Sequence, residues 1–317
     1  MPGRNAVFLV TDEKLFPAAA FAAGRLAELN NRNDTDIIVF TDAADELRLA
    51  PSRAYPFEVV PMVQPDGVNL PPTYFRIFVP PQLASRYSRL LYLDVDTYVE
   101  NETPFALFDL DLRGHALAAV RDYVIACSPD WAEIQAVFGS RHFKYFNAGV
   151  LLIDTAGYVA RHASEKMLQV IASGTSAFRH RDQSSLNHHF NGDFAELSPA
   201  FNMFGVAEGT PLPLVAPPVL THFVSRRKPW MGPLFGSDHK ARAEMERFFP
   251  TSPWPNFLGR FYNADAKAPP GRPPNIIGGF QGQAPIAHYL RETPFADVAA
   301  GLTRLNLDAL QRATAPA

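Results

Sequence analysis

Short apolar runs alternate along much of the chain with longer segments in which apolar residues recur every three or four positions. The short runs are typical of buried strands, and the longer pattern is typical of the helices that cover them. Strands are predicted over residues 6–11, 36–41, 57–62, 89–93, 115–120, 145–154 and 219–224. Helices are predicted over residues 16–29, 72–79, 103–105, 130–138, 158–172, 182–190, 240–249 and 294–310. The alternation predicts an α/β fold with a mostly parallel, Rossmann-like sheet flanked by helices.

Two pairs of prolines bound the helix predicted over residues 72–79. Pro71 and Pro72 lie at its start, where proline is tolerated, and Pro80 and Pro81 follow it. Because proline in a helix interior removes a hydrogen bond and clashes with the preceding turn, the second pair is expected to end the helix.

The segment after residue 236 has a different character. Many of the 29 prolines lie beyond residue 210, and residues 268–274 are expected to form an extended loop. The chain is therefore predicted to divide into a domain over residues 1–236 and a helical, proline-rich extension over residues 237–317. Aromatic and basic residues between 248 and 262 are expected to pack on the domain, with peripheral contact to a membrane surface as the alternative.

Composition narrows the classes of function and the location. The formal net charge of -3 argues against a surface that binds nucleic acid. The single cysteine, Cys127, cannot form an internal disulfide, which suits a reducing compartment. No apolar run approaches the ~20 residues that a membrane span needs, and the run over residues 6–10 leads into acidic residues, unlike a signal peptide. A cytoplasmic location is expected, and the sequence leaves the oligomeric state open.

Two carboxylates follow the strand predicted over residues 89–93. Asp94 and Asp96 are separated by Val95, so both side chains point the same way if the extended geometry continues. Open α/β sheets bind ligands at this edge, and carboxylate oxygens suit Mg²⁺ or Mn²⁺. The alternative is an ordinary turn, because aspartate is common after strands.

His222 is the candidate third ligand for such an ion. It lies on the strand predicted over residues 219–224, and three cations follow it, Arg226, Arg227 and Lys228. A metal ligand followed by cations is what a diphosphate leaving group needs, because both neutralise its charge. The alternatives are a hydrogen-bonded core histidine and a solvated basic loop.

Four further positions in the sequence carry residues that can line a binding site. Asp182 and Gln183 begin a helix, either as an ordinary N-cap or facing a pocket. Arg76 lies among apolar residues and can snorkel to solvent or pair with Asp94 or a phosphate. Asp122 follows a strand, as Asp94 does. Small residues that allow close approach of a ligand or of backbone begin the strand over residues 145–154: Asn147, Ala148 and Gly149.

Six segments occur in one order and cover most of residues 70–232: PTYFRIFVP, RLLYLDVDTYV, AAVRD, YFNAGVLLID, RDQSSLN and THFVSRRKPW. Together they resemble glycosyltransferase family 8, which has the GT-A fold. The N-terminal VFLVTDEKLFPAAAFAAGRL is similar to the nucleotide-binding start of that family. The resemblance implies a mixed, mostly parallel GT-A sheet with its nucleotide-sugar-binding domain over residues 1–236.

The resemblance also implies a metal-dependent retaining transferase, similar to bacterial lipopolysaccharide galactosyl- and glucosyltransferases of polysaccharide biosynthesis. The donor would be a UDP-sugar and the metal Mn²⁺, with Mg²⁺ as the alternative. The acceptor would be a glycan, a lipid-linked glycan or another hydroxyl compound. The implied metal ligands are Asp94, Asp96 and His222. The implied nucleotide and diphosphate contacts are Thr11, Asp12 and Lys228. The implied sugar-pocket and catalytic residues are Arg76, Asp122, Asn147, Ala148, Gly149, Asp182 and Gln183.

Two other functions share parts of this pattern. A nucleotidyltransferase that makes nucleotide-sugars also has carboxylates at the sheet edge, but it normally has a glycine-rich basic loop where this chain has TDEKLF. A non-catalytic UDP-sugar-binding protein would keep the fold without turnover. For a transferase, the amide of Gln183 is a poor nucleophile, and Asp182 is a better one only if it reaches the anomeric carbon. Retention is therefore expected through same-face attack, with a covalent intermediate on Asp182 as the alternative.

Overall fold

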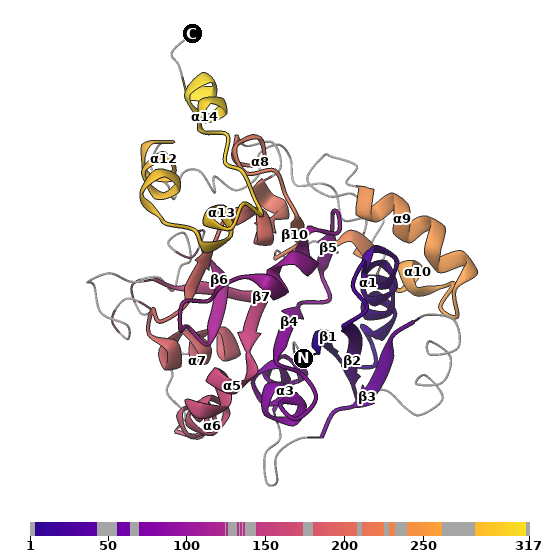
Figure 1. Ribbon diagram of the computed structural model, residues 1–317. Coiled ribbons are helices and arrows are strands. Elements are labelled where there is room, and N and C mark those ends of the chain that lie inside the picture. Colours follow the sequence, from indigo (N-terminus) through magenta and orange to yellow (C-terminus); the bar gives the residue numbers. More distant parts are fainter. Residues whose placement is uncertain are drawn as a thin grey trace.

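The computed structural model describes residues 4–42, 56–63, 70–123, 125, 132, 134, 136, 144–173, 180–207, 211–224, 228–231, 240–261 and 283–314. In these ranges a seven-stranded sheet lies at the centre, in the order β3-β2-β1-β4-β7-β6-β8 (Figure 1). Its strands are β1 (Asn5–Thr11), β2 (Thr35–Thr41), β3 (Glu58–Pro61), β4 (Arg89–Leu93), β6 (Leu117–Arg121), β7 (Phe146–Asp154) and β8 (Ala195–Leu197). Neighbouring strands are parallel, except that β7 is antiparallel to β4 and β6. The predicted α/β fold with a mostly parallel sheet is confirmed.

Helices cover both faces of this sheet. The described α-helices are α1 (Phe16–Leu29), α3 (Phe75–Leu83), α5 (Thr155–Ala160), α6 (Ala163–Ala172), α7 (Arg181–Phe190), α8 (Leu212–Val215), α9 (Lys240–Phe248), α10 (Phe257–Phe261), α12 (Gln283–Glu292), α13 (Ala296–Ala299) and α14 (Leu307–Thr314). Side chains alternate along β1, so Val7 and Leu9 pack with α1 on one face. Phe8 and Val10 pack with α3, α6 and α7 on the other face.

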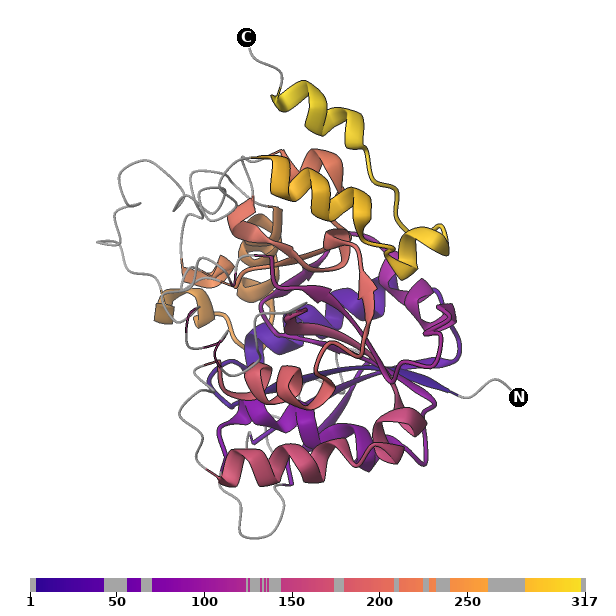
Figure 2. The same cartoon turned by 90° about the vertical axis from the view of Figure 1, so that its left-hand side faces the viewer.

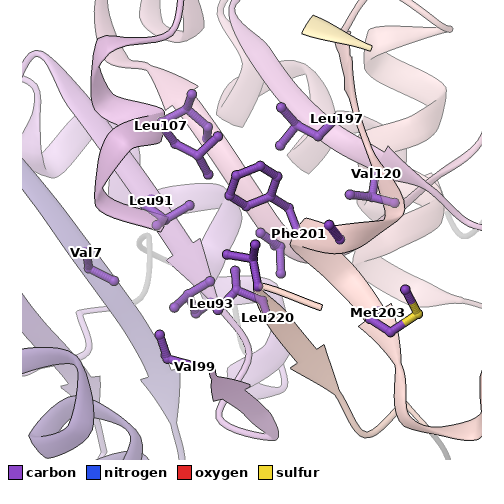
Figure 3. Packing of buried hydrophobic residues seen from close by; sticks show 14 of the residues in the cluster. Val7, Leu91, Leu93, Val99, Leu107, Val120, Leu197, Phe201, Met203 and Leu220 are labelled. Carbon is purple, nitrogen blue, oxygen red and sulfur yellow. The ribbon is translucent and has the colours of Figure 1, made fainter. Parts of the chain in front are cut away.

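A second sheet of three strands, in the order β5-β10-β9, positions the polar residues that follow β4. Its strands are β5 (Thr97–Val99), β9 (Met203–Phe204) and β10 (Leu220–His222). Val99 and Leu220 pack in one buried cluster with Leu91 and Leu93 of β4 (Figure 3). Because β10 pairs antiparallel with β5, it brings a segment distant in sequence against the connection that follows β4.

Helix α3 was predicted to end before Pro80. The structure shows instead that it continues through Pro80 and Pro81 to Leu83. Proline at position 81 cannot donate a backbone hydrogen bond to the carbonyl of Ile77, four residues earlier. That carbonyl accepts from the hydroxyl of Tyr158 at 3.0 Å and from that of Ser164 at 2.6 Å. Tertiary partners thus replace the missing helical bond, and the helix persists.

Two further helix predictions need correction. The segment predicted as one helix over residues 158–172 lies in α5 and α6, which are separated at His162 by a left-handed φ of 50°. The single helix predicted over residues 294–310 is wrong, because residues 300–306 are not helical and Gly301 has a φ of 78°. A left-handed residue cannot continue a right-handed helix. Helix α12 was not predicted.

Residues 240–261 and 283–314 pack on the α/β core. Phe249 and Phe257 are buried with Phe21 of α1, so these aromatic side chains offer no surface for a membrane contact. Asp297 is fully buried, accepts the backbone N–H of Ser198 at 2.5 Å, and accepts from the hydroxyl of Thr303. Helices α12, α13 and α14 lie on the side of the sheet away from α3 and α6 (Figure 2).

Some predictions fall outside the described residues. The helix predicted over residues 130–138 is described only at residues 132, 134 and 136, and the loop predicted over residues 268–274 is not described. The predicted boundary between residues 236 and 237 lies in the undescribed stretch 232–239, so it stays a prediction. None of the helices in the described part of the chain combines the length and apolar character that crossing a membrane requires.

Candidate active site

Asp94 and Asp96 lie in a tight turn between β4 and β5. The turn is closed by Thr97, whose N–H and hydroxyl both donate to the carbonyl of Asp94, at 3.0 and 2.7 Å. The prediction that extended geometry aligns the two carboxylates is therefore wrong, because β4 ends at Leu93. The turn itself makes them converge.

His222 completes a group of three possible metal ligands. The pairing of β10 with β5 places His222 opposite Thr97, at the end of the turn. The Nε2 atom of His222 lies 3.5 Å from Oδ2 of Asp94 and 3.3 Å from Oδ1 of Asp96. One ligand atom from each of the three residues lies within 4.8 Å of the others. The predicted metal ligands are thus brought together, with His222 buried beneath the two carboxylates.

The carboxylates each use one oxygen for the protein and turn the other toward His222. Oδ1 of Asp94 accepts from the hydroxyl of Tyr92 at 2.5 Å and pairs with Arg76 at 3.0 Å. Oδ2 of Asp96 accepts from the ammonium of Lys228. Burial would raise the pKa of Asp96, but His222 and Lys228 outweigh burial and hold that pKa well below its usual range. Two anionic oxygens and one imidazole nitrogen therefore face a common point, which fits a divalent cation.

Gly149 on β7 gives this group its room. A Cβ atom at this position would lie 2.7 Å from Nδ1 of His222 and 2.9 Å from Oδ2 of Asp94. Both distances are shorter than the contacts that Cβ atoms make with other heavy atoms in proteins. The small residue at this position therefore makes room for the side chains of His222 and Asp94, and the predicted approach of a ligand stays a prediction.

Arg76 is buried, so the alternative in which it snorkels to solvent is wrong. Its guanidinium pairs with Asp94 at 3.0 Å and with Asp182 at 2.7 Å. It also donates to the carbonyl of Ala148 at 2.7 Å and lies over the ring of Tyr92, 4.6 Å from the centroid. The predicted pairing with Asp94 is confirmed, and Arg76 connects the turn after β4 to α7.

Asp182 lies inside the first turn of α7, whose N-cap is His180, and its side chain is buried. Burial raises the pKa of Asp182 to about 6, although the guanidinium of Arg76 lowers it. Asp182 therefore does not act as an ordinary N-cap. It is buried against Arg76 and is not among the residues that line the cavity beside Asp94 and Asp96, so its place in a pocket stays a prediction.

Gln183 begins a row of hydrogen-bonded amides. Its Nε2 donates to Oδ2 of Asp122 at 3.1 Å. Its Oε1 accepts from Nδ2 of Asn147 at 3.2 Å and from the backbone N–H of Ala148 at 3.1 Å. The predicted residues Asp122, Asn147 and Gln183 thus form one connected group.

Asn202 extends this row to His222 and was not predicted. It is fully buried, donates to Oδ1 of Asn147 at 2.9 Å, and faces Nδ1 of His222 with its Oδ1 at 2.9 Å. Its sequence surroundings, FNMF, carry no polar motif, and only the pairing of β9 with β10 brings it to the site.

A cavity of about 440 Å³ opens beside the carboxylates of Asp94 and Asp96. Among its lining residues are the predicted Thr11, Asp12, Arg76, Asp94, Asp96 and Lys228. Arg181 and Trp230 also line it and were not predicted as site residues, while Arg226 and Arg227 lie outside the described residues. The end of β1, the turn after β4 and the Lys228 segment thus share one hollow.

Comparison with known proteins identifies the family. A family model described as glycosyl transferase family 8 matches residues 66–232, more than half of the chain. The chain belongs to glycosyltransferase family 8. Glycosyltransferase GlyF of Streptococcus pneumoniae is 29% identical over 164 residues, which cover 50% of this chain and 37% of GlyF. A lipopolysaccharide 1,3-galactosyltransferase of Salmonella typhimurium is 26% identical over 168 residues, covering 50% of this chain and 49% of that enzyme.

Solved structures of this family share the fold. An active-site mutant of LgtC superposes with a TM-score of 0.65 at 21% identity, over 76% of this chain and 94% of LgtC. The galactosyltransferase LgtC in complex with donor and acceptor sugar analogues superposes with a TM-score of 0.59 at 20% identity, over 83% and 98% of the two chains. The predicted GT-A fold is thereby confirmed for this member of family 8.

Proposed function

We propose that this chain is a retaining, metal-assisted glycosyltransferase that moves galactose or glucose from a UDP-sugar to a hydroxyl of a glycan, such as a lipid-linked glycan. The observation that supports this most is the convergence of Asp94, Asp96 and His222 beside a cavity that Lys228 also lines. The choice of sugar follows the relatives, which include the Salmonella galactosyltransferase and a lipopolysaccharide 1,2-glucosyltransferase of Escherichia coli, 29% identical over 114 residues.

The metal in this proposal is Mn²⁺, with Mg²⁺ as the alternative, held by Asp94, Asp96 and His222. The donor set supports it, because each carboxylate turns one oxygen away from its protein partners and toward Nε2 of His222. Two carboxylates and one imidazole suit Mn²⁺ better than Mg²⁺, which prefers oxygen ligands alone. When bound, the ion would supply Lewis-acid stabilisation of the diphosphate.

Lys228 is proposed to hold the diphosphate of the donor. Its ammonium already contacts Asp96 and the carbonyl of Phe223, so it stands at the cavity wall. A positive charge there stabilises the negative charge that develops on UDP as the bond to the sugar breaks. Thr11 and Asp12, at the end of β1 in the same cavity, are proposed to approach the uracil or ribose.

The sugar is proposed to meet Asp122, Asn147, Asp182 and Gln183. The amide of Gln183 is already engaged on both sides, and an amide is a poor nucleophile. One oxygen of Asp182 is held by Arg76. We therefore favour same-face attack. In this step the acceptor oxygen bonds to the anomeric carbon on the face from which UDP leaves, while the bond between the anomeric carbon and the phosphate oxygen breaks. The hydroxyl proton passes to the departing phosphate.

A donor screen tests the proposal. The purified chain is incubated with UDP-galactose, UDP-glucose and other UDP-sugars, with Mn²⁺ or with a chelator, and UDP release is measured. Manganese-dependent release of UDP supports the transferase, even as slow hydrolysis without an acceptor. Binding of UDP without turnover over a broad acceptor panel would point to a non-catalytic binding protein. Release of pyrophosphate from UTP and a sugar phosphate would point to a nucleotidyltransferase.

A further inference from the structure

We propose that Asn202 is a positioning residue that keeps the proton of the His222 imidazole on Nδ1, so that Nε2 presents its lone pair to a divalent cation. This inference rests on the proposed metal site. It is carried by the direction of four hydrogen bonds that run from the backbone of β7, through side-chain amides, to His222.

The direction of the row is set by backbone groups that can only donate. The N–H of Gly149 donates to Oδ1 of Asn147 at 2.9 Å, and the N–H of Ala148 donates to Oε1 of Gln183 at 3.1 Å. A backbone N–H has no acceptor lone pair, so both side-chain atoms must be oxygens. The amide of Asn147 therefore turns its NH₂ toward Gln183, and its oxygen has one more acceptor position to fill.

Asn202 passes this direction on. Because the atom of Asn147 that it meets is an acceptor, Asn202 must donate its NH₂ there, at 2.9 Å. Its own oxygen is then the atom that faces Nδ1 of His222, also at 2.9 Å. An oxygen opposite Nδ1 requires a proton on Nδ1, and the neutral imidazole then has its lone pair on Nε2.

The hydrogen bond from His222 to Asn202 has to keep the proton on Nδ1 although two nearby carboxylates favour a proton on Nε2. Nε2 lies 3.5 Å from Asp94 and 3.3 Å from Asp96, and two carboxylates attract the imidazole proton to the nitrogen that must bind the ion. Metal-binding histidines usually donate their other N–H to an acceptor that fixes the tautomer, and loss of such an acceptor typically costs 10–100-fold in metal affinity. Asn202, fully buried at the end of the 3-10 helix that precedes β9, supplies that acceptor.

The test reads the tautomer directly. In metal-free protein, ¹⁵N NMR of labelled histidine should show that the neutral form of His222 has a protonated Nδ1 and an unprotonated Nε2. An unprotonated Nδ1 in the unaltered protein would overturn the inference without any variant. In Asn202→Leu, which removes the acceptor, we expect the proton to move to Nε2 and the affinity for Mn²⁺ to fall by about 10–100-fold.

Three variants separate positioning from general damage. Asn202→Asp keeps an oxygen opposite Nδ1 and should retain the protonated Nδ1. Asn187→Leu removes another buried asparagine, which bonds the backbone of Phe146 at 2.8 Å but does not contact His222, and should leave the tautomer unchanged. Asp122→Asn changes the far end of the row and should also leave it unchanged, because the backbone sets the direction.

The outcomes distinguish this inference from the metal proposal. A shift of the His222 proton in Asp122→Asn or in Asn187→Leu would overturn the inference, as would an unshifted proton and unchanged Mn²⁺ affinity in Asn202→Leu. If the unaltered protein shows a protonated Nδ1 but does not bind Mn²⁺, the metal proposal fails while the role of Asn202 in fixing the tautomer stands.

Discussion

The polar site has two halves, one built mainly from charged side chains beside a cavity and one built mainly from hydrogen-bonded side chains in the interior. The carboxylate half consists of Asp94, Asp96, His222 and Lys228, and the amide half consists of Asp122, Asn147, Gln183 and Asn202. In the carboxylate half, formal charges surround a cavity, and the side chains of Asp94 and Lys228 are 23% and 22% exposed. In the amide half, directional hydrogen bonds connect the residues, and Asn202 is completely buried.

The difference separates binding from positioning. In the carboxylate half, one oxygen of Asp94 and one of Asp96 face the same side of His222. A bound cation would relieve the repulsion between these two carboxylates, so this half is suited to a cationic ligand. The amide half has its donors and acceptors paired within the protein, so it is suited to hold directions constant. Arg76 connects the halves, because it pairs with Asp94 on one side and with Asp182 and the backbone of β7 on the other.

The largest effect on stability is expected from breaking this connection. Arg76→Leu should lower the free energy of unfolding by about 3–5 kcal/mol, because it leaves Asp182 and one oxygen of Asp94 without their buried cation. Urea denaturation measures this. Arg86→Leu is the control, because Arg86 pairs with Glu58 while 51% exposed and should cost at most about 1 kcal/mol. Equal losses in the two variants would contradict the connecting role of Arg76.

Loss of either carboxylate of the carboxylate half is expected to lower turnover strongly. Asp96→Ala and Asp94→Ala should lower manganese-dependent UDP release by about 10²–10³-fold or more, because charge stabilisation of this size is lost with a single group. Asp109→Ala, which removes an exposed partner of Arg32, should leave the rate unchanged. Full activity of the Asp94 or Asp96 variants in the presence of a chelator would contradict metal dependence.

Asp182 and Asp96 should change the stability with opposite sign as pH changes. The pKa of Asp182 is raised to about 6, so the folded state binds its proton more tightly than the unfolded chain, whose aspartates titrate near 3.9. Its contribution to stability is therefore present below about pH 4 and is lost as pH rises through about 6. Relative to the unaltered protein, Asp182→Asn should become more stable by up to about 3 kcal/mol between these pH values.

Asp96 supplies the comparison for that measurement. Burial would raise the pKa of Asp96, but His222 and Lys228 lower it below the unfolded value, so its contribution is present above about pH 4 and is lost as pH falls. The stability difference between Asp96→Asn and the unaltered protein should therefore change only in acid. Unfolding curves for both variants from pH 3 to 8 that changed with the same sign would contradict the opposite pKa shifts of Asp182 and Asp96.

The smallest effect on stability is expected at Gly149, whose backbone N–H bonds to Asn147 and which lies against His222 and Asp94. Gly149→Ala should cost about 1–3 kcal/mol of stability and weaken Mn²⁺ binding, because the added methyl group overlaps His222 and Asp94. Gly259→Ala in α10 meets open space and should be neutral or slightly stabilising. Thermal unfolding and Mn²⁺ titration measure both variants. An alanine at position 149 that binds Mn²⁺ normally would show that the ligands have room to move.

Much of the fold was predictable because buried strands have local signatures. Strands β1, β2, β4 and β7 each contain an apolar run of three or more residues, and α1 was predicted with its observed bounds. Strands β5, β8 and β9 were missed, because they contain only two or three residues and form through pairing with distant segments. The extension of α3 past Pro80 was missed for the same reason, since Tyr158 and Ser164 supply the replacement bonds.

The candidate site divides in the same way. Its charged residues were predicted, since a carboxylate pair after an apolar strand and a histidine before cations are visible in the sequence. Asn202 was not, because a buried asparagine between apolar residues looks the same whether it bonds to backbone or to a ligand. The predicted roles of the individual residues in transfer stay predictions.

The sequence by itself determined the order of apolar strands, the chemical groups at their ends and the segments that characterise family 8. Tertiary structure alone decided that a turn, rather than a strand, aligns Asp94 with Asp96, that β10 sets His222 opposite Thr97, and that Asn202 faces Nδ1 of His222. The physical reason is that burial of apolar residues follows from local composition. The partner and the direction of each polar group depend on which distant backbone atoms lie beside it.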